Sequence, residues 1–148
     1  MQLFQHPAFD VFAFCSAVLV FKMMIVGHIV GIGRIRLKAF INPEDAAALG
    51  SGEVEPVAAE HPDIDRGLRA HRNDLESTLP FLAIGWVYLA MGPSEGLATW
   101  LFVSFTALRC AFSVFYLRGM QPWRSLSFLA AELVVIIMLV QIVYRSVQ

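Results

Sequence analysis

Three long apolar runs constrain the fold of this chain more than any other feature of its sequence. They cover about Val11–Gly33, Leu97–Leu117 and Leu126–Tyr144, and about 20 apolar residues in a helix suffice to cross ~30 Å of hydrocarbon. Within lipid, backbone N–H and C=O groups must be satisfied inside the protein, which helices and closed barrels achieve. Because the sequence has no barrel-like alternation of polar and apolar residues, it predicts an all-α integral membrane protein.

One more span, the second in chain order, is predicted at an apolar run that is too short by itself to cross the bilayer. Leu79–Gly92 does not reach across the bilayer as a helix, so the helix must extend backward through the polar stretch 66–78. The chain is then expected to form one domain over 1–148, an integral membrane four-helix bundle. Its spans cover about 11–38, 66–92, 97–117 and 124–144, and a long polar loop covers 41–65.

The long loop is expected to contain one short helix. Asn42 is a good N-cap residue, Pro43 suits the first helical position, and Glu44 and Asp45 complement the helix dipole. This helix is expected to stop at Gly50–Ser51–Gly52, and the rest of the loop to be irregular.

Basic residues predict the orientation in the membrane. The side of the long loop carries most of them, and the opposite side carries Arg145. The positive-inside rule therefore predicts a cytoplasmic loop, with both termini on the far side of a bacterial inner membrane or the endoplasmic reticulum. The basic residues on the loop side are Arg34, Arg36, Lys38, Arg66, Arg69, Arg72, Arg118 and Arg124.

The polar half of the second span carries its polar groups on one helical face. At 100° per residue, Arg66, Arg69, Asn73 and Glu76 lie within about 80° of one another, and Arg72 lies about 40° to the side. A charge at membrane depth costs ~2.5–3.5 kcal/mol on insertion scales, so such groups face the bundle interior or a polar cavity. This stripe by itself fits a salt-bridge network and a ligand pocket equally well.

Other polar residues favour the pocket. Arg34 ends the first span, Tyr116 ends the third, and Arg124 and Ser125 open the fourth, all near the same predicted boundary. Cations suit carboxylates, and a helix N-terminus with free N–H groups suits an oxyanion or a thiolate. Together with Glu76, which suits an ammonium group, these residues predict a small ligand that carries both signs of charge.

Charged residues inside the spans are expected to pair. Lys22 is predicted to pair with Asp74, Glu76 or Glu132, and Arg109 is the proposed mate of Glu132. The cysteines lack the spacing of a metal site or a disulfide, so no metal is expected. The net charge of −1 gives no indication of nucleic-acid binding.

Several segments together resemble the MAPEG family, membrane-associated proteins in eicosanoid and glutathione metabolism. Within that family they are most similar to the branch of microsomal prostaglandin E synthases and microsomal glutathione transferases. The resemblance covers nearly the whole chain from Val11 onward. It rests on "RIRLKAFINPEDA" from Arg34, "LRAHRNDLE" from Leu68, "PFLAIGWVY" from Pro80 and "RSLSF" from Arg124.

The resemblance implies a homotrimer that binds glutathione between subunits near the cytoplasmic face, with lipophilic substrates entering from membrane lipid. Arg34 is expected to reach glutathione from one protomer. The neighbouring protomer is expected to supply Arg72, Asn73, Glu76, Tyr116, Arg124 and Ser125.

The resemblance also assigns candidate catalytic residues. Arg124 and Ser125 match the pair that stabilises the glutathione thiolate, and Asp45 matches an aspartate proposed to act in prostaglandin isomerisation. A first-turn acid also complements a helix dipole, so Asp45 has a structural interpretation as well.

The chain departs from the prostaglandin synthase pattern at Phe112, Phe128 and Glu132, where that pattern has histidine, tyrosine and glutamine. These departures favour a glutathione transferase or peroxidase that acts on lipophilic electrophiles or lipid peroxides. The alternatives are a prostaglandin-E-synthase-type isomerase and, from another class, a non-catalytic membrane scaffold or lipid-binding protein.

Overall fold

The described part of the chain, residues 5–50 and 54–148, is entirely helical in its regular structure. In the computed structural model it forms five helices and no strands: α1 (Phe9–Leu37), α2 (Pro43–Leu49), α3 (Pro62–Ala90), α4 (Glu95–Leu117) and α5 (Trp123–Ser146). The prediction of an all-α fold is confirmed. Four of the helices are long, and the fifth, α2, is the short helix expected inside the polar loop.

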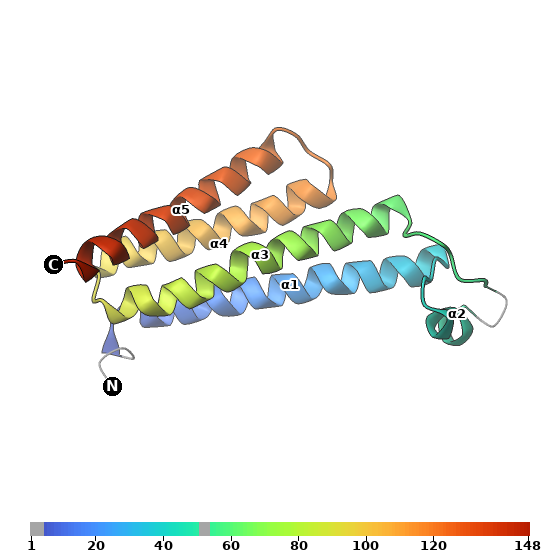
Figure 1. The fold of residues 1–148 in the computed structure, drawn as a ribbon, viewed down its shortest axis with the longest axis horizontal. Coiled ribbons are helices and arrows are strands. Elements are labelled where there is room, and N and C mark those ends of the chain that lie inside the picture. Colours follow the sequence, from blue (N-terminus) through green and yellow to red (C-terminus); the bar gives the residue numbers. More distant parts are fainter. Residues whose placement is uncertain (1–4, 51–53) are drawn as a thin grey trace.

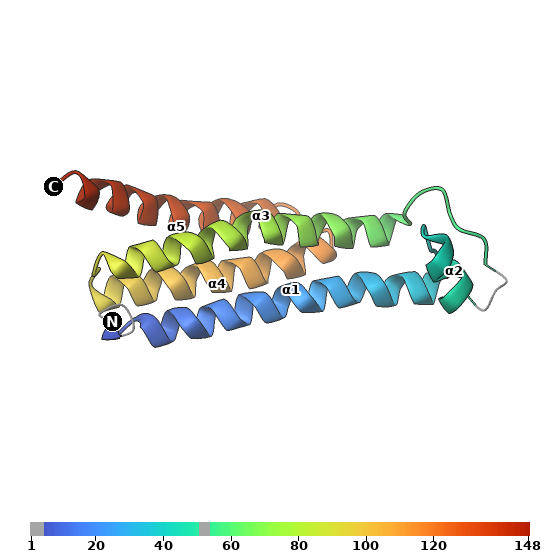
Figure 2. The same cartoon turned by 60° about the horizontal axis from the view of Figure 1, so that its bottom comes forward.

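The four long helices run side by side along the length of the molecule (Figures 1 and 2). The start of α1, the end of α5 and the α3–α4 turn lie at one end, whereas α2 and the α4–α5 turn lie toward the other (Figure 1). In the described residues α1, α4 and α5 are long and apolar enough to cross a membrane. The helix α3 is 29 residues long, but charged residues fill much of its first half.

Local sequence explains where the helices near the loop begin and end. Asn42 precedes α2 in an extended conformation and Pro43 is its first residue, as predicted, although the Asn42 amide donates to Asp45 Oδ2 at 3.0 Å instead of accepting from the backbone. The helix ends before Gly50; Ser51 and Gly52 of the predicted stop lie outside the described residues.

The helix α3 begins at Pro62, four residues before the predicted Arg66. Pro62 suits the first helical position, where its missing N–H is not needed. The His61 ring accepts the backbone N–H of Asp63 at 3.3 Å, and Asp63 and Asp65 stand in the first turn, where acids complement the dipole. The loop before α3 is therefore shorter than predicted, and α3 continues without a break through Pro80.

An aromatic core holds α1, α3 and α4 together. Phe81 of α3 stacks on Phe105 of α4 with ring centroids 3.9 Å apart, and Phe12 of α1 lies 4.9 Å from Phe102 of α4. A Cβ at Gly85 would lie 2.3 Å from the Phe12 ring. The absence of a side chain at Gly85 therefore lets α1 approach α3 closely.

At the end opposite the polar loop, an arginine of α5 forms hydrogen bonds to the end of α3. Arg145, near the end of α5, donates from Nη1 to the carbonyls of Met91 and Gly92 at 2.5 and 2.9 Å. These carbonyls follow the last turn of α3, where a helix has unsatisfied acceptors and a negative dipole end. Arg145 thus joins the C-terminal ends of α3 and α5.

Candidate functional site

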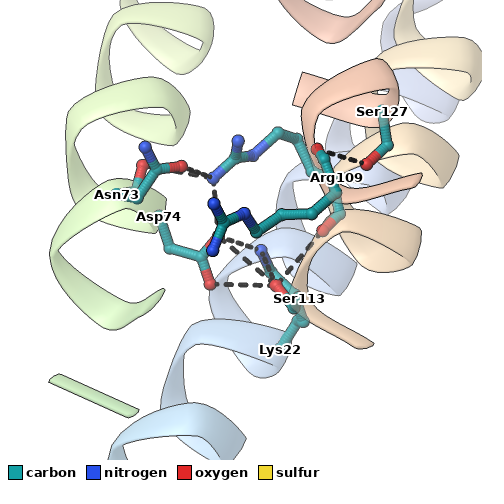
Figure 3. A network of polar contacts seen from close by, with 7 residues as sticks. Lys22, Asn73, Asp74, Arg109, Ser113 and Ser127 are labelled. Carbon is teal, nitrogen blue, oxygen red and sulfur yellow. Dashed lines mark hydrogen bonds and ion pairs between the residues drawn. The ribbon is translucent and has the colours of Figure 1, made fainter. Parts of the chain in front are cut away.

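A buried charge network lies between α1, α3 and α4 (Figure 3). Asp74 of α3, which is fully buried, accepts from Lys22 Nζ at 2.6 Å and from Arg109 Nη2 at 2.7 Å. Ser113, one turn after Arg109, donates to the same carboxylate at 3.2 Å. One carboxylate therefore serves cations from two other helices.

The network confirms one predicted pairing and corrects another. Lys22 pairs with Asp74, which was one of its three predicted partners. Arg109 pairs with Asp74 and not with Glu132. Glu132 lies close enough to act electrostatically on Arg109, but within residues 5–50 and 54–148 it forms neither a hydrogen bond nor an ion pair.

Arg109 is the most constrained member of this network. It is fully buried, and its guanidinium lies 4.3 Å from the centroid of the Phe112 ring. Nη2 also contacts Asn73, at 2.9 Å to the side-chain Oδ1 and 3.1 Å to the backbone carbonyl. In the described part of the chain, Nε and Nη1 are buried without a hydrogen-bond partner, which costs free energy in an apolar interior.

Next to this network a cavity of about 400 Å³ opens between α3, α4 and α5. One of its walls is apolar, and the remainder carries a guanidinium, two hydroxyls and an amide. Its lining residues are Asn73, Phe112, Tyr116, Arg124, Ser125, Phe128 and Leu129.

Arg124 is held at the start of α5 by two neighbours. Its guanidinium lies 4.8 Å from the centroid of the Tyr116 ring, in cation–π distance. With the Gln121 amide oxygen facing the guanidinium, that oxygen accepts from Arg124 at 2.6 and 3.1 Å and the amide nitrogen donates to Ser125 Oγ at 3.0 Å. Gln121 thus links the two residues, one turn before Ser125.

One donor of the helix N-terminus is already used. The N–H of Arg124 donates to the Met120 carbonyl at 3.1 Å. The N–H of Leu126 donates to the Pro122 carbonyl at 3.0 Å, which is the first hydrogen bond of the helix itself. The charge of Arg124 and the hydroxyl of Ser125 add to what this helix end offers to a ligand.

The structure brings four of the predicted site residues together at the cavity: Asn73, Tyr116, Arg124 and Ser125. Arg72 and Glu76 are exposed on α3 and do not line it. Arg34 and Asp45 line a separate hollow of about 170 Å³ between α1 and α2, and Arg34 forms an ion pair with Glu60.

Sequence reasoning missed Gln121 and Leu129 as neighbours of this site. For Leu129 the spacing contained the signal, because Ser125 and Leu129 are four residues apart on one face of α5. Gln121 lies in the turn before α5, where helical spacing gives no signal. Phe112 and Phe128 stood out only as departures from a family pattern, and both form part of the cavity wall.

Taken together, the fold and the cavity define a helical membrane protein with a mixed polar and apolar pocket near one end. The model of the MAPEG family matches residues 12–144, and the chain belongs to this family.

Several named relatives match almost the whole chain. It is 41% identical to prostaglandin E synthase of Homo sapiens over 141 residues, which are 95% of this chain and 91% of the relative. Prostaglandin E synthase of Canis lupus familiaris is also 41% identical, over 99% of this chain and 94% of the relative. Microsomal glutathione S-transferase 1 of Homo sapiens is 36% identical, over 86% of this chain and 83% of the relative.

Proposed function

We propose that the chain is a glutathione-dependent membrane enzyme, a transferase or peroxidase that acts on lipophilic electrophiles or lipid peroxides. The observation that carries the proposal is the pairing of Arg124 with Ser125 at one cavity, with Tyr116 and Asn73 beside them. Similarity to a microsomal glutathione S-transferase supports the choice of ligand.

The chemistry of this pair suits activation of a thiol. A free thiol has a pKa of ~8.5, so about 3% is thiolate at pH 7. A guanidinium beside the sulfur favours the anion, and lowering the thiol pKa by about two units would make about three quarters of it thiolate. Arg124 supplies that charge, and Ser125 donates a hydrogen bond to the sulfur. The nucleophile belongs to glutathione, and the protein binds and orients it.

Attack then follows from the bound thiolate. Its sulfur forms a bond to an electrophilic carbon, and the electron pair of the broken bond leaves with the departing group. With a lipid hydroperoxide, the sulfur attacks the terminal peroxide oxygen, the O–O bond breaks, and the lipid alkoxide leaves and takes up a proton to become the alcohol. A second glutathione then attacks the sulfur of the sulfenic acid so formed, which gives glutathione disulfide and water. The apolar cavity wall at Phe112, Phe128 and Leu129 suits lipophilic substrates.

The oligomer and the orientation form part of the same proposal. Arg34 and Asp45 line a hollow separate from the cavity, and large apolar side chains of α1 such as Phe14 and Phe21 are exposed. A homotrimer in which Arg34 of a second copy completes the site accounts for both features. In this arrangement α3 crosses the membrane together with α1, α4 and α5. Arg72 and Glu76 then face the ligand or the neighbouring protomer, and the site lies near the cytoplasmic face.

A second candidate activity is prostaglandin-endoperoxide isomerisation. The 41% identity to prostaglandin E synthases favours it, with Asp45 as the additional catalytic residue. Phe112 and Phe128 place apolar rings at the cavity where the resemblance expects polar groups. We therefore rank this activity below the transferase.

The test measures thiolate formation and turnover in detergent-purified protein. Glutathione is expected to produce thiolate ultraviolet absorbance, and turnover is expected with an aromatic electrophile or a lipid hydroperoxide. Arg124→Ala should lose both, whereas Arg118→Ala, which removes an exposed cation from the same connection, should retain both. Full activity in Arg124→Ala refutes the mechanism, and absence of glutathione binding supports the scaffold alternative.

A further inference from the structure

Arg109 does not line the cavity, but it forms hydrogen bonds to Asn73, which does. Its Nη2 donates to Asn73 Oδ1 at 2.9 Å and to the Asn73 carbonyl at 3.1 Å (Figure 3). A guanidinium has only donors, so the side-chain atom that it contacts is the amide oxygen. The Asn73 NH₂ group is thereby left for other partners, and Asn73 lines the cavity.

This orientation of the Asn73 amide limits which ligand groups can form a hydrogen bond with it. An asparagine amide that rotates freely presents either a donor or an acceptor, whereas an amide held by its oxygen presents donors. The complementary ligand group is a carboxylate or carbonyl oxygen. An ammonium group is a poor match because it has only donors.

Arg109 is itself fixed. The same Nη2 donates to Asp74 at 2.7 Å, and Asp74 is held by Lys22 at 2.6 Å and by Ser113 at 3.2 Å. Arg109 and Asp74 are fully buried, and the Phe112 ring covers the guanidinium at 4.3 Å. The two N–H groups of Arg109 Nη2 are therefore shared among three acceptors on α3. These acceptors are the backbone carbonyl and the side-chain oxygen of Asn73 and the carboxylate of Asp74.

We propose that Arg109 is a positioning residue of the cavity, which holds the Asn73 amide so that its NH₂ group binds a carboxylate or carbonyl oxygen of the ligand. The inference rests on the proposed function, because it assumes that the cavity binds glutathione. The Lys22–Asp74 pair then acts on ligand binding through Arg109, without contact to the ligand.

A double-mutant cycle on glutathione affinity tests this role. The dissociation constant is measured by calorimetric titration of detergent-purified protein for wild type, Asn73→Ala, Arg109→Lys and the double variant. Each single variant is expected to weaken binding about tenfold. The double variant is expected to bind no more weakly than the weaker single variant, because Arg109 acts through Asn73. Losses that multiply to about a hundredfold overturn the inference.

A second variant separates positioning from stability and leaves Arg109 unchanged. Asn73→Asp keeps an acceptor for Arg109 but offers no donor to the cavity, so it should lose at least tenfold in affinity while retaining the wild-type melting temperature. Wild-type affinity in Asn73→Asp refutes the proposal. The matched control is Tyr88→Phe, which removes a hydrogen bond to Gln141 far along α3 and should leave affinity unchanged.

The same titrations distinguish the two proposals. If wild-type protein binds no glutathione, the proposed function fails and this inference fails with it. If wild type binds but the losses multiply, only the role of Arg109 is overturned.

Discussion

Replacing Asp74 by asparagine removes the carboxylate that Lys22 and Arg109 share. The side chain keeps its size, so the change is chiefly one of charge. Asp74 and Arg109 are fully buried, and the Lys22 side chain is only 12% exposed. Neither cation therefore gains water when its partner is neutralised.

The expected loss of stability is large. Removing one partner of a buried ion pair costs about 3–5 kcal/mol, because the remaining charge stays buried without compensation. Here one substitution leaves two cations unpaired, so we expect the upper part of that range, about 4–5 kcal/mol. Replacing Lys22 as well, in Asp74→Asn/Lys22→Met, leaves one unpaired cation and should recover about 2 kcal/mol.

The measurement is resistance to denaturant or heat in detergent, followed by helical circular dichroism. Glu55→Gln is the matched control, since it neutralises an exposed acid and should shift stability by less than about 0.5 kcal/mol. A loss below about 1 kcal/mol in Asp74→Asn, or a further loss in the double variant, would refute the reasoning that the Asp74 side chain stabilises both buried cations.

Three other substitutions give sharp expectations. Gly85→Ala places a Cβ against the Phe12 ring and should destabilise the protein by about 1–3 kcal/mol in thermal unfolding. The control is Gly96→Ala, because the space around Gly96 is open. Equal effects of the two substitutions would contradict the packing argument. Arg145→Ala should cost about 1 kcal/mol through lost contacts to the end of α3, seen as faster hydrogen exchange there; unchanged exchange would show that the cap is dispensable. Phe128→Tyr adds a hydroxyl at the cavity, and one hydrogen bond of ~0.5–1.5 kcal/mol should tighten glutathione binding about two- to tenfold; no change in the titration would place this ring out of reach of the ligand.

Sequence reasoning succeeded where the physics is local. Apolar run length predicted α1, α4 and α5, and the cap residues Asn42 and Pro43 predicted the start of α2. The helix of the second apolar run does extend backward through the polar stretch, because α3 is one continuous helix from Pro62 to Ala90; that this helix spans the membrane stays a prediction. In each case the signal lies within a few turns of chain.

Ion-pair partners were harder to predict because they depend on how helices are rotated against one another. Asp74 was only one of three predicted partners of Lys22, and it pairs with both Lys22 and Arg109. Glu132 and Arg109 are both inside apolar segments, which made them plausible mates. A single helix sequence gives the face of each residue but not which neighbour that face meets.

The same limit applies to the cavity. Asn73, Tyr116, Arg124 and Ser125 come from three helices, and their proximity follows from the packing of α3, α4 and α5. The separation of Arg34 and Asp45 from that cavity likewise depends on where α1 ends and α2 turns back.

The shared carboxylate has a consequence for the order in which the chain enters the membrane. Lys22 precedes Asp74 by 52 residues, and Asp74 precedes Arg109 by 35. In the proposed four-span arrangement, α1 therefore meets lipid during synthesis before its counter-charge has been made, at ~2.5–3.5 kcal/mol for an unpaired lysine near a helix centre. The apolar side chains of α1 would then have to offset the cost of that lysine until α3 inserts, and α4 would bring Arg109 to a carboxylate that is already in place.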